Sequence, residues 1–226
     1  MMTQNENLIL LYFCRRLKSN IIMRRISVAS LIICFLATNI DCTKPVSNKP
    51  LNSVNSTTEQ DDAKGKAVIY LIKKGTHYCK PNPLRFSSKN TISFTAVFDS
   101  SCIYQTVDPS NQNDINKLYG FSDCNSHHLE NSARIGWRWS NDSLRIFGFV
   151  HYGGEMISQQ ITTAQIDSVL NCCITCLDTA YEFNVNGNVL LLPRHCSGKY
   201  TRYRLYPYFG GDETAPHKIK IQLTEL

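Results

Sequence analysis

Arginine and aromatic residues recur at alternate positions in the second half of the sequence, and together these residue types suit the binding of sugars. An arginine guanidinium binds a carboxylate through two parallel hydrogen bonds, and an aromatic ring offers a flat apolar surface. If these segments are strands of one sheet, their outward side chains form one face. That face would contain Arg134, Arg138, Arg145, Phe147, Arg204, Tyr206 and Tyr208. The pattern predicts a surface that binds an acidic polysaccharide.

An ordinary solvated face is the alternative interpretation, because arginine stems often cover aromatic rings while their charged ends stay in water. A polysaccharide lyase or glycoside hydrolase on the same face is a second interpretation. A lyase would need a cation that neutralises a uronate carboxylate and a side chain that takes a proton. Arg134 or Arg138 could supply the first, and Tyr206, Tyr208 or His151 the second. No serine-hydrolase elbow, phosphate loop or dinucleotide motif is present. We therefore assign no catalytic residue, and a structural protein of the cell envelope is a third interpretation.

Three further groups of potential ligands are His127 with His128, Asp212 with Glu213 and His217, and Cys172 with Cys173 and Cys176. Loop carboxylates more often cap turns than bind calcium. The cysteine group lacks a second ligand pair at zinc-finger spacing, so we expect buried thiols that pack as small apolar groups. Seven cysteines follow residue 64, and an odd number leaves at least one outside intramolecular disulfides. No metal and no cofactor is expected.

The elements that would position these residues are strands, because apolar and polar residues alternate with a period of two. The segments are residues 67–72, 91–98, 133–139, 144–150, 156–162, 181–185, 189–192, 203–209 and 218–223, and residues 165–176 fit either a short helix or a buried strand. Asn141-Asp142, Gly153-Gly154 and Asn186-Gly187 predict hairpin turns. About nine or ten short strands predict an all-β fold, an antiparallel sandwich or barrel.

A targeting segment is predicted over residues 1–41. Arg24 and Arg25 precede a short apolar run, residues 26–40, as in secretory signals. The run is shorter than the ~20 residues that a membrane-spanning helix requires. Met23 stands directly before the two arginines, which suggests that it is the biological start.

Cys42 follows the apolar run and resembles the lipidation site of bacterial lipoproteins, although Asp41 stands where that motif has a small residue. Cleavage without lipidation and an uncleaved anchor are the alternatives. Residues 42–64 are polar and predict a flexible tether, and residues 65–226 form the predicted sandwich domain. We expect an exported protein of the cell envelope, held on a membrane at its periplasmic or outer surface through a lipid.

The charge balance argues against nucleic acid as a partner. Of the 24 basic and 18 acidic residues, five and two respectively lie in residues 1–41. The remainder therefore has a net charge of only +3, without a basic run.

Four stretches, residues 117–124, 127–128, 131–139 and 208–217, resemble a family of exported proteins of Bacteroidota, and this resemblance covers roughly residues 66–226. It implies no particular activity. The layout also resembles the concanavalin A-like jelly roll, in which a concave face often holds carbohydrate. Tyr208-Phe209-Gly210-Gly211 is similar to the Tyr-Phe-Lys-Ala-Gly motif of alginate lyases of this class, but the lysine is missing. Their Gln-x-His motif and the Glu-x-Asp-x-x-Glu motif of laminarinase-like hydrolases are also absent.

Overall fold

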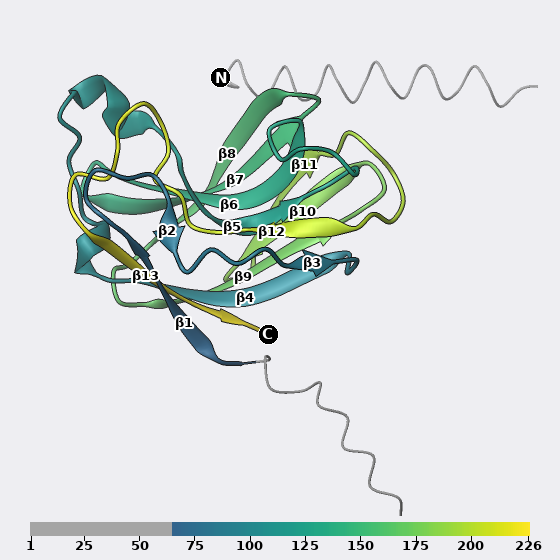
Figure 1. Cartoon of the computed structure of the whole chain (residues 1–226), viewed down its shortest axis with the longest axis horizontal. Helices are drawn as coiled ribbons and strands as arrows, with labels where there is room; N and C mark the ends of the chain where they lie inside the picture. The colour runs from purple at the N-terminus through teal and green to yellow at the C-terminus, as the bar shows by residue number, and fades with distance from the viewer. Residues whose placement is uncertain (1–64) are drawn as a thin grey trace, which may run out of the picture. The chain divides into compact units, whose positions relative to one another are not determined.

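Residues 65–226 are described by a computed structural model, and they form two β-sheets that pack face to face (Figure 1). One sheet has seven strands in the order β11-β10-β9-β4-β13-β1-β2, and the other has six in the order β3-β12-β5-β6-β7-β8. Every strand pair is antiparallel. This architecture confirms the predicted all-β sandwich of the jelly-roll type. The predicted targeting segment, Cys42 and the tether lie outside the described residues.

The strands are β1 (Ala67–Ile72), β2 (Cys79–Lys80), β3 (Phe86–Ser87), β4 (Thr91–Phe98), β5 (Asn116–Ser122), β6 (Asn131–Ser140), β7 (Ser143–Tyr152), β8 (Glu155–Ala164), β9 (Val169–Cys176), β10 (Ala180–Val185), β11 (Asn188–Pro193), β12 (Arg202–Leu205) and β13 (Ile219–Glu225). Two short 3-10 helices, η1 (Ser100–Cys102) and η2 (Pro109–Asn113), lie between β4 and β5. Within residues 65–226 we find no helix with the length and apolar character to cross a membrane.

The three hairpin turns occur where the sequence predicts them. Asn141 and Asp142 between β6 and β7 both have positive φ, as do Gly153-Gly154 and Asn186-Gly187 in the next two predicted turns. Two residues with positive φ give a turn whose twist matches that of the flanking strands. Residues 165–176 contain strand β9, which resolves the helix-or-strand ambiguity in favour of the strand.

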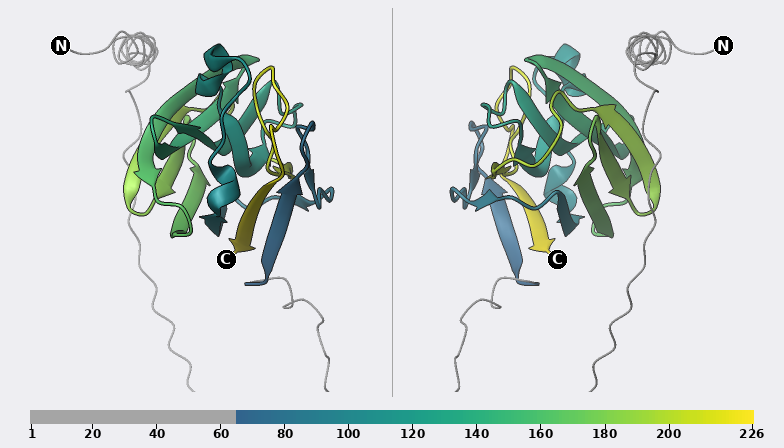
Figure 2. Two further views of the ribbon diagram at one scale, coloured as in Figure 1. Left: turned by 90° about the vertical axis from the view of Figure 1, so that its left-hand side faces the viewer. Right: turned by 90° about the vertical axis from the view of Figure 1, so that its right-hand side faces the viewer.

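Inward side chains of both sheets build one core between the layers, and the sheets that enclose it are curved (Figure 2). Its largest buried members include Phe94, Phe98, Tyr119, Phe121, Trp137 and Phe183. Cys79, Cys102, Cys172 and Cys176 are buried and free, as expected for thiols that pack as small apolar groups. Strands β1 and β13 lie side by side, and Gly65 N donates a hydrogen bond to Glu225 O at 3.0 Å.

Candidate functional site

The outward face of the six-stranded sheet carries the basic residues. Strand pairing aligns its outward side chains in four rows, which are Ser132 with His151, Arg134 with Gly120 and Phe149, Lys117 with Gly136 and Phe147, and Arg138 with Arg145. The neighbours Ala133, Ile135 and Trp137 are fully buried in the core. The predicted outward orientation of Arg134, Arg138, Arg145 and Phe147 is therefore correct. Tyr208 forms an isolated bridge with Lys117 and joins the same face.

The predicted outward orientation of Arg204 and Tyr206 is wrong. Arg204 pairs with Phe121, a core residue, and its Nε lies 3.5 Å from a carboxylate oxygen of Glu225. Tyr206 is only 5% exposed and belongs to the hydrophobic core. Strand β12 ends at Leu205, two residues before Pro207, so simple alternation does not extend from Arg204 to Tyr208.

Arg134 lies on this face as a buried cation. Its side chain is only 7% exposed, and Nη2 donates a 2.7 Å hydrogen bond to the carbonyl oxygen of Tyr206. Its Nε has no hydrogen-bond partner. Burial lowers the pKa of Arg134 to about 9, because a guanidinium without water is costly to keep charged.

Lys117 adds a second cation beside Arg134. Its Nζ donates to Ile115 O at 2.8 Å and lies 4.6 Å from the centre of the Phe149 ring. Burial, followed by the positive charge of Arg134, lowers the pKa of Lys117 to about 8. A Cβ at Gly210 would lie 2.8 Å from this Nζ. The amine of Lys117 therefore lies directly against the backbone of Gly210.

Neither cation has an acidic partner. The ion pairs of residues 65–226 involve Arg85, Arg194, Arg202, Arg204 and Lys220, but not Lys117 or Arg134. Asp114 lies near enough to favour the charged form of Lys117 without forming an ion pair. Buried charges are normally paired with an opposite charge. A bound anion would therefore compensate the positive charges of Arg134 and Lys117.

The outer part of the face fits the solvated-face interpretation better. Arg138 lies over the Phe147 ring, 4.9 Å from its centre, and donates to the carbonyl oxygen of Asn113. Arg145 bonds to Ser140 O and to the Gln160 side chain, each at 3.2 Å. The Phe147 ring is therefore covered by an arginine and is not free to stack on a sugar.

Free aromatic surface lies instead around Tyr208. Its ring stacks on His77, with centres 5.2 Å apart, and meets Tyr78 edge-on at 5.1 Å. Tyr78 is 66% exposed. Burial, followed by Tyr78, raises the pKa of Tyr208 while Arg134 opposes that change, so the Tyr208 hydroxyl is protonated at neutral pH.

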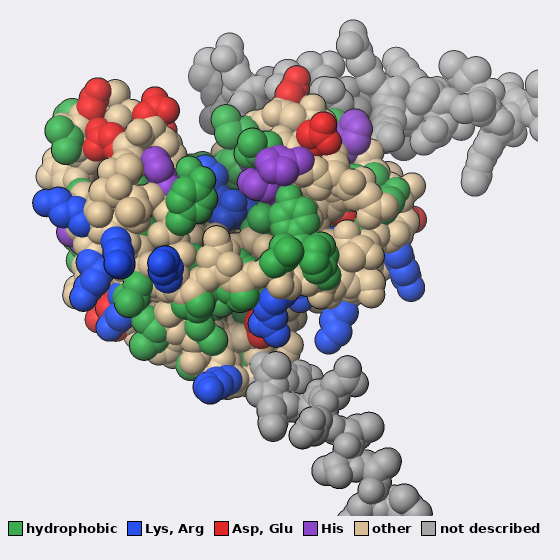
Figure 3. Space-filling model, viewed as in Figure 1, with side chains coloured by type: hydrophobic (Ala, Val, Ile, Leu, Met, Phe, Trp, Pro, Cys, Tyr) green, Lys and Arg blue, Asp and Glu red, His purple; other side chains and the backbone are tan. Residues whose placement is uncertain are grey.

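Two histidines at the same face are neutral at physiological pH. His151 Nδ1 lies 3.1 Å from Ser132 Oγ, and His128 Nδ1 lies 3.0 Å from Tyr203 Oη. Burial lowers the pKa of each histidine to about 4, and the charge of Arg134 acts in the same direction. A neutral imidazole can accept a proton from a bound molecule. We call Lys117, Arg134, His151 and Tyr208 the basic recess, and Figure 3 shows a hollow with blue side chains at its base and histidines beside it.

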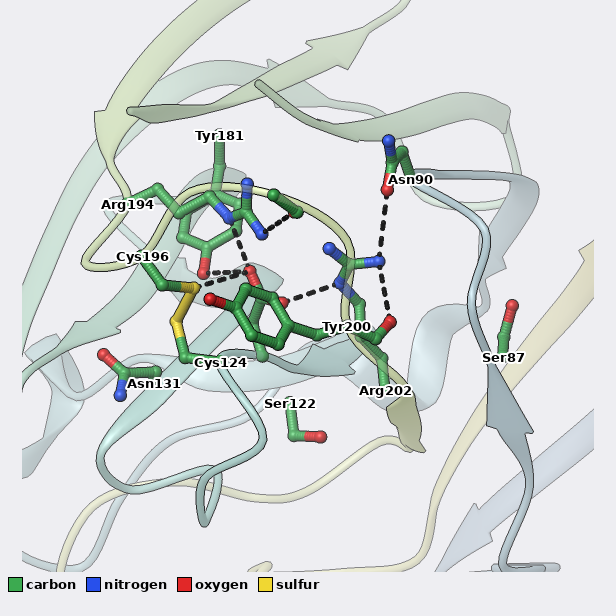
Figure 4. Close-up of polar contacts among 12 residues, drawn as sticks. Ser87, Asn90, Ser122, Cys124, Asn131, Tyr181, Arg194, Cys196, Tyr200 and Arg202 are labelled. Carbon is green, nitrogen blue, oxygen red and sulfur yellow. Dashed lines mark hydrogen bonds and ion pairs between the residues drawn. A yellow bond between two sulfur atoms is a disulfide. The ribbon is translucent and has the colours of Figure 1, made fainter. Parts of the chain in front are cut away.

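A buried ionic cluster holds the loop that carries the two sequential histidines (Figure 4). Asp123, which directly follows β5, forms ion pairs with Arg194 Nε at 2.6 Å and with Arg202 Nε at 2.8 Å. It also accepts a hydrogen bond from Tyr181 Oη at 2.9 Å. A disulfide joins the next residue, Cys124, to Cys196. Asp123, Cys124 and Cys196 are close enough to hold a metal, but the disulfide occupies both sulfurs.

The acidic loop group has a structural role. Glu213 accepts hydrogen bonds from the backbone N–H groups of Val107 and Asp108 and from the side chain of Asn111. His217 Nε2 lies 2.8 Å from Ser101 O. These contacts tie two loops together, as the turn-capping interpretation predicts.

Sequence reasoning missed Lys117, Tyr203 and His77. Lys117 stands at a register shift between β5 and β6, and nearly all of β5 is buried on both faces. A period of two is therefore absent there, and the Lys-Leu-Tyr-Gly-Phe run alone does not reveal which side chains face out.

No protein-family model and no curated protein sequence matches the chain. Solved structures resemble it in fold. Alginate lyase AlyC3 has a TM-score of 0.47 at 11% identity, over 71% of this chain and 74% of its own. The marine alginate lyase AlyA1 from Zobellia galactanivorans has a TM-score of 0.45 at 10% identity, over 76% of this chain and 82% of its own. The laminarinase catalytic domain from Thermotoga maritima has a TM-score of 0.43 at 11% identity, over 74% of this chain and 80% of its own. The expected relation to exported proteins of Bacteroidota stays a prediction.

Proposed function

We propose that the basic recess binds the carboxylates of an acidic polysaccharide. The observation that carries this proposal is that two cations, Arg134 and Lys117, lie next to each other and that neither has a carboxylate partner. A bound uronate would place a negative charge beside Arg134, whose Nε has no hydrogen-bond partner. A neutral glucan could not compensate these charges, because hydroxyl groups are weaker acceptors than carboxylates.

The groups around the recess favour a sugar chain over a small isolated anion. Tyr78 and Tyr208 offer ring surface on one side, and Arg138 and Arg145 extend the positive charge along β6 and β7. A polymer with repeated carboxylates could contact both regions.

Binding can be tested by isothermal titration of the full chain with polygalacturonate, alginate and neutral laminarin. We expect the first two to bind and laminarin not to bind. Lys117→Gln should weaken binding about tenfold to a hundredfold, because a charge-assisted hydrogen bond contributes about 1.5–3 kcal/mol. Lys218→Gln, which removes the same charge from an exposed position outside the recess, is the matched control. No binding of either polyuronate, or equal losses in both variants, would refute the proposal.

A second candidate function on the same recess is β-elimination, favoured by the position of His151 in the row next to Arg134, with an imidazole that is unprotonated at neutral pH. The base would take the proton next to the uronate carboxylate while Arg134 stabilises the charge that develops there. The electron pair then forms a double bond as the glycosidic carbon–oxygen bond breaks, and protonated Tyr208 would supply a proton to the leaving oxygen. Hydrolysis is less suited, because it requires two carboxylic residues and the four rows of this face contain none.

Elimination produces an unsaturated sugar end that absorbs ultraviolet light. We expect an absorbance increase with alginate or polygalacturonate, lost in His151→Gln and retained in His217→Gln. A flat trace over the whole pH range in which the protein stays folded would remove the lyase candidate and leave the binding proposal standing.

The proposal extends to the location of the protein. Arg24, Arg25 and the apolar residues 26–40 support export, and Cys42 with the polar residues 43–64 supports a lipid anchor followed by a spacer. Expression in a bacterial host with a fatty-acid label should label the wild type but not Cys42→Ser. Equal labelling of the two, or none in either, would refute lipidation.

A further inference from the structure

A cavity of about 220 Å³, separate from the basic recess, lies between the two sheets at the edge where β1 and β13 meet the six-stranded sheet. We call it the edge cavity, and it is lined by Lys66, Val68, Tyr70, Arg85, Tyr119, Leu223 and Glu225. This volume is many times the roughly 10–15 Å³ that a single water molecule requires. The edge cavity can therefore hold one small cyclic molecule.

A buried hydroxyl lies directly behind the lining of this cavity. Tyr206 is 5% exposed, and its ring lies 5.6 Å from the rings of both Tyr70 and Tyr119, which line the cavity. Its hydroxyl is buried and makes no hydrogen bond of good geometry. Burial raises the pKa of Tyr206, and the nearby guanidinium of Arg85 opposes that change. A buried hydroxyl without a partner is costly, so an acceptor from a ligand would satisfy a group that the protein leaves unpaired.

The charges around the edge cavity favour an anion. Glu225 lies 3.7 Å from Arg85 Nη1 and 3.5 Å from Arg204 Nε, and it also accepts a hydrogen bond from the Tyr119 hydroxyl. The cavity lining thus contains two cations, Lys66 and Arg85, and one carboxylate, Glu225, which also pairs with Arg204 outside the lining. Arg85 is the most accessible of the paired cations, with a side chain 48% exposed.

We propose that the edge cavity binds a small monocyclic carboxylate. The carboxylate would pair with Arg85, a polar ring substituent or a carboxylate oxygen would accept from the Tyr206 hydroxyl, and the ring would pack against Val68, Tyr70 and Leu223. Val68 and Leu223 provide the apolar wall, since they pack against the core from paired positions on β1 and β13. This site uses no residue of the basic recess and does not depend on the proposed polysaccharide binding.

Titration of the full chain with benzoate and 4-hydroxybenzoate, followed by saturation-transfer NMR, tests the proposal, with benzamide as the neutral analogue. We expect millimolar binding of the two acids and none of benzamide. Arg85→Gln should weaken binding about tenfold, and Tyr206→Phe about threefold, as expected for loss of a charged and a neutral hydrogen bond respectively. Tyr206→Phe keeps the ring contacts, so its thermal unfolding should match that of the wild type.

Lys218→Gln, which removes a charge at an exposed position outside both sites, is the control and should bind the acids like the wild type. Arg138→Gln tests whether the acids occupy the outward face instead. Absence of binding by both acids would overturn the proposal. Loss of binding in Arg138→Gln with retention in Arg85→Gln would also overturn it, since the probe would then occupy the outward face. Benzoate binding without polyuronate binding would support the edge cavity while removing the polysaccharide proposal.

Discussion

Replacing Asp123 by asparagine should be among the most destabilising single changes in the described domain. The carboxylate is fully buried and touches two buried guanidinium groups at 2.6 and 2.8 Å. Removing one partner of a buried ion pair costs about 3–5 kcal/mol, because the other charge remains buried without compensation. Here Arg194 and Arg202 would lose their shared carboxylate together. The expected loss of about 3–5 kcal/mol is a large part of the roughly 5–15 kcal/mol by which domains are stable.

Urea unfolding followed by circular dichroism measures this loss. Lys220→Gln is the control, because it breaks an exposed ion pair to Asp99 at 2.8 Å and should leave the unfolding curve nearly unchanged. A loss below about 1 kcal/mol for Asp123→Asn would refute the reasoning, since it would mean that water or another group compensates both arginines. The bond from Tyr181 can persist to the asparagine oxygen, so the ionic contribution is what the substitution measures.

Three other outcomes follow from the same physical arguments. Polyuronate affinity should fall as pH rises through about 8, because Lys117 then loses its proton, and Lys117→Arg should keep the affinity in titrations to higher pH. The free energy of unfolding should fall as pH drops from about 6.5 towards 4. His151 has a pKa of about 4 in the folded state and therefore binds its proton more readily when the chain is unfolded. In acid unfolding, the His151→Gln variant should show a smaller decline in this free energy than the wild type. Replacing both Cys124 and Cys196 by serine should cost about 4 kcal/mol in chemical denaturation, since their bond closes a loop across 72 positions, whereas an unchanged midpoint would show that the chain-entropy account does not hold here.

Turn dipeptides were sufficient to predict the hairpins, and local alternation was sufficient to predict the outward arginines of β6 and β7. In those strands each residue's neighbours fix its side, so Arg134 and Arg138 face out because Ile135 and Trp137 face in. The same rule failed for Arg204 and Tyr206, because β12 is only four residues long and ends two residues before Pro207. It gave no answer for β5, where a register shift at Lys117 interrupts the pairing.

The buried ionic cluster was beyond sequence reasoning for a different reason. Asp123 meets Arg194 and Arg202 from 71 and 79 residues away, and nothing in the local pattern marks these three side chains as partners. The disulfide is similar, because seven cysteines allow many pairings. What the sequence could not predict at the candidate site is the burial of Arg134, since an outward position on a strand normally predicts exposure to water.

The hydrogen bond between Gly65 and Glu225 places both ends of the folded domain at a single point of the seven-stranded sheet. A short linker could therefore join the two ends, and new ends could be opened at the exposed Asn186-Gly187 turn without crossing the core. A bead or sensor chip coupled at residue 65 or 226 would hold the protein by the layer opposite the arginine-bearing face. Surface-based measurements with long sugar chains can then be made without the support blocking their approach.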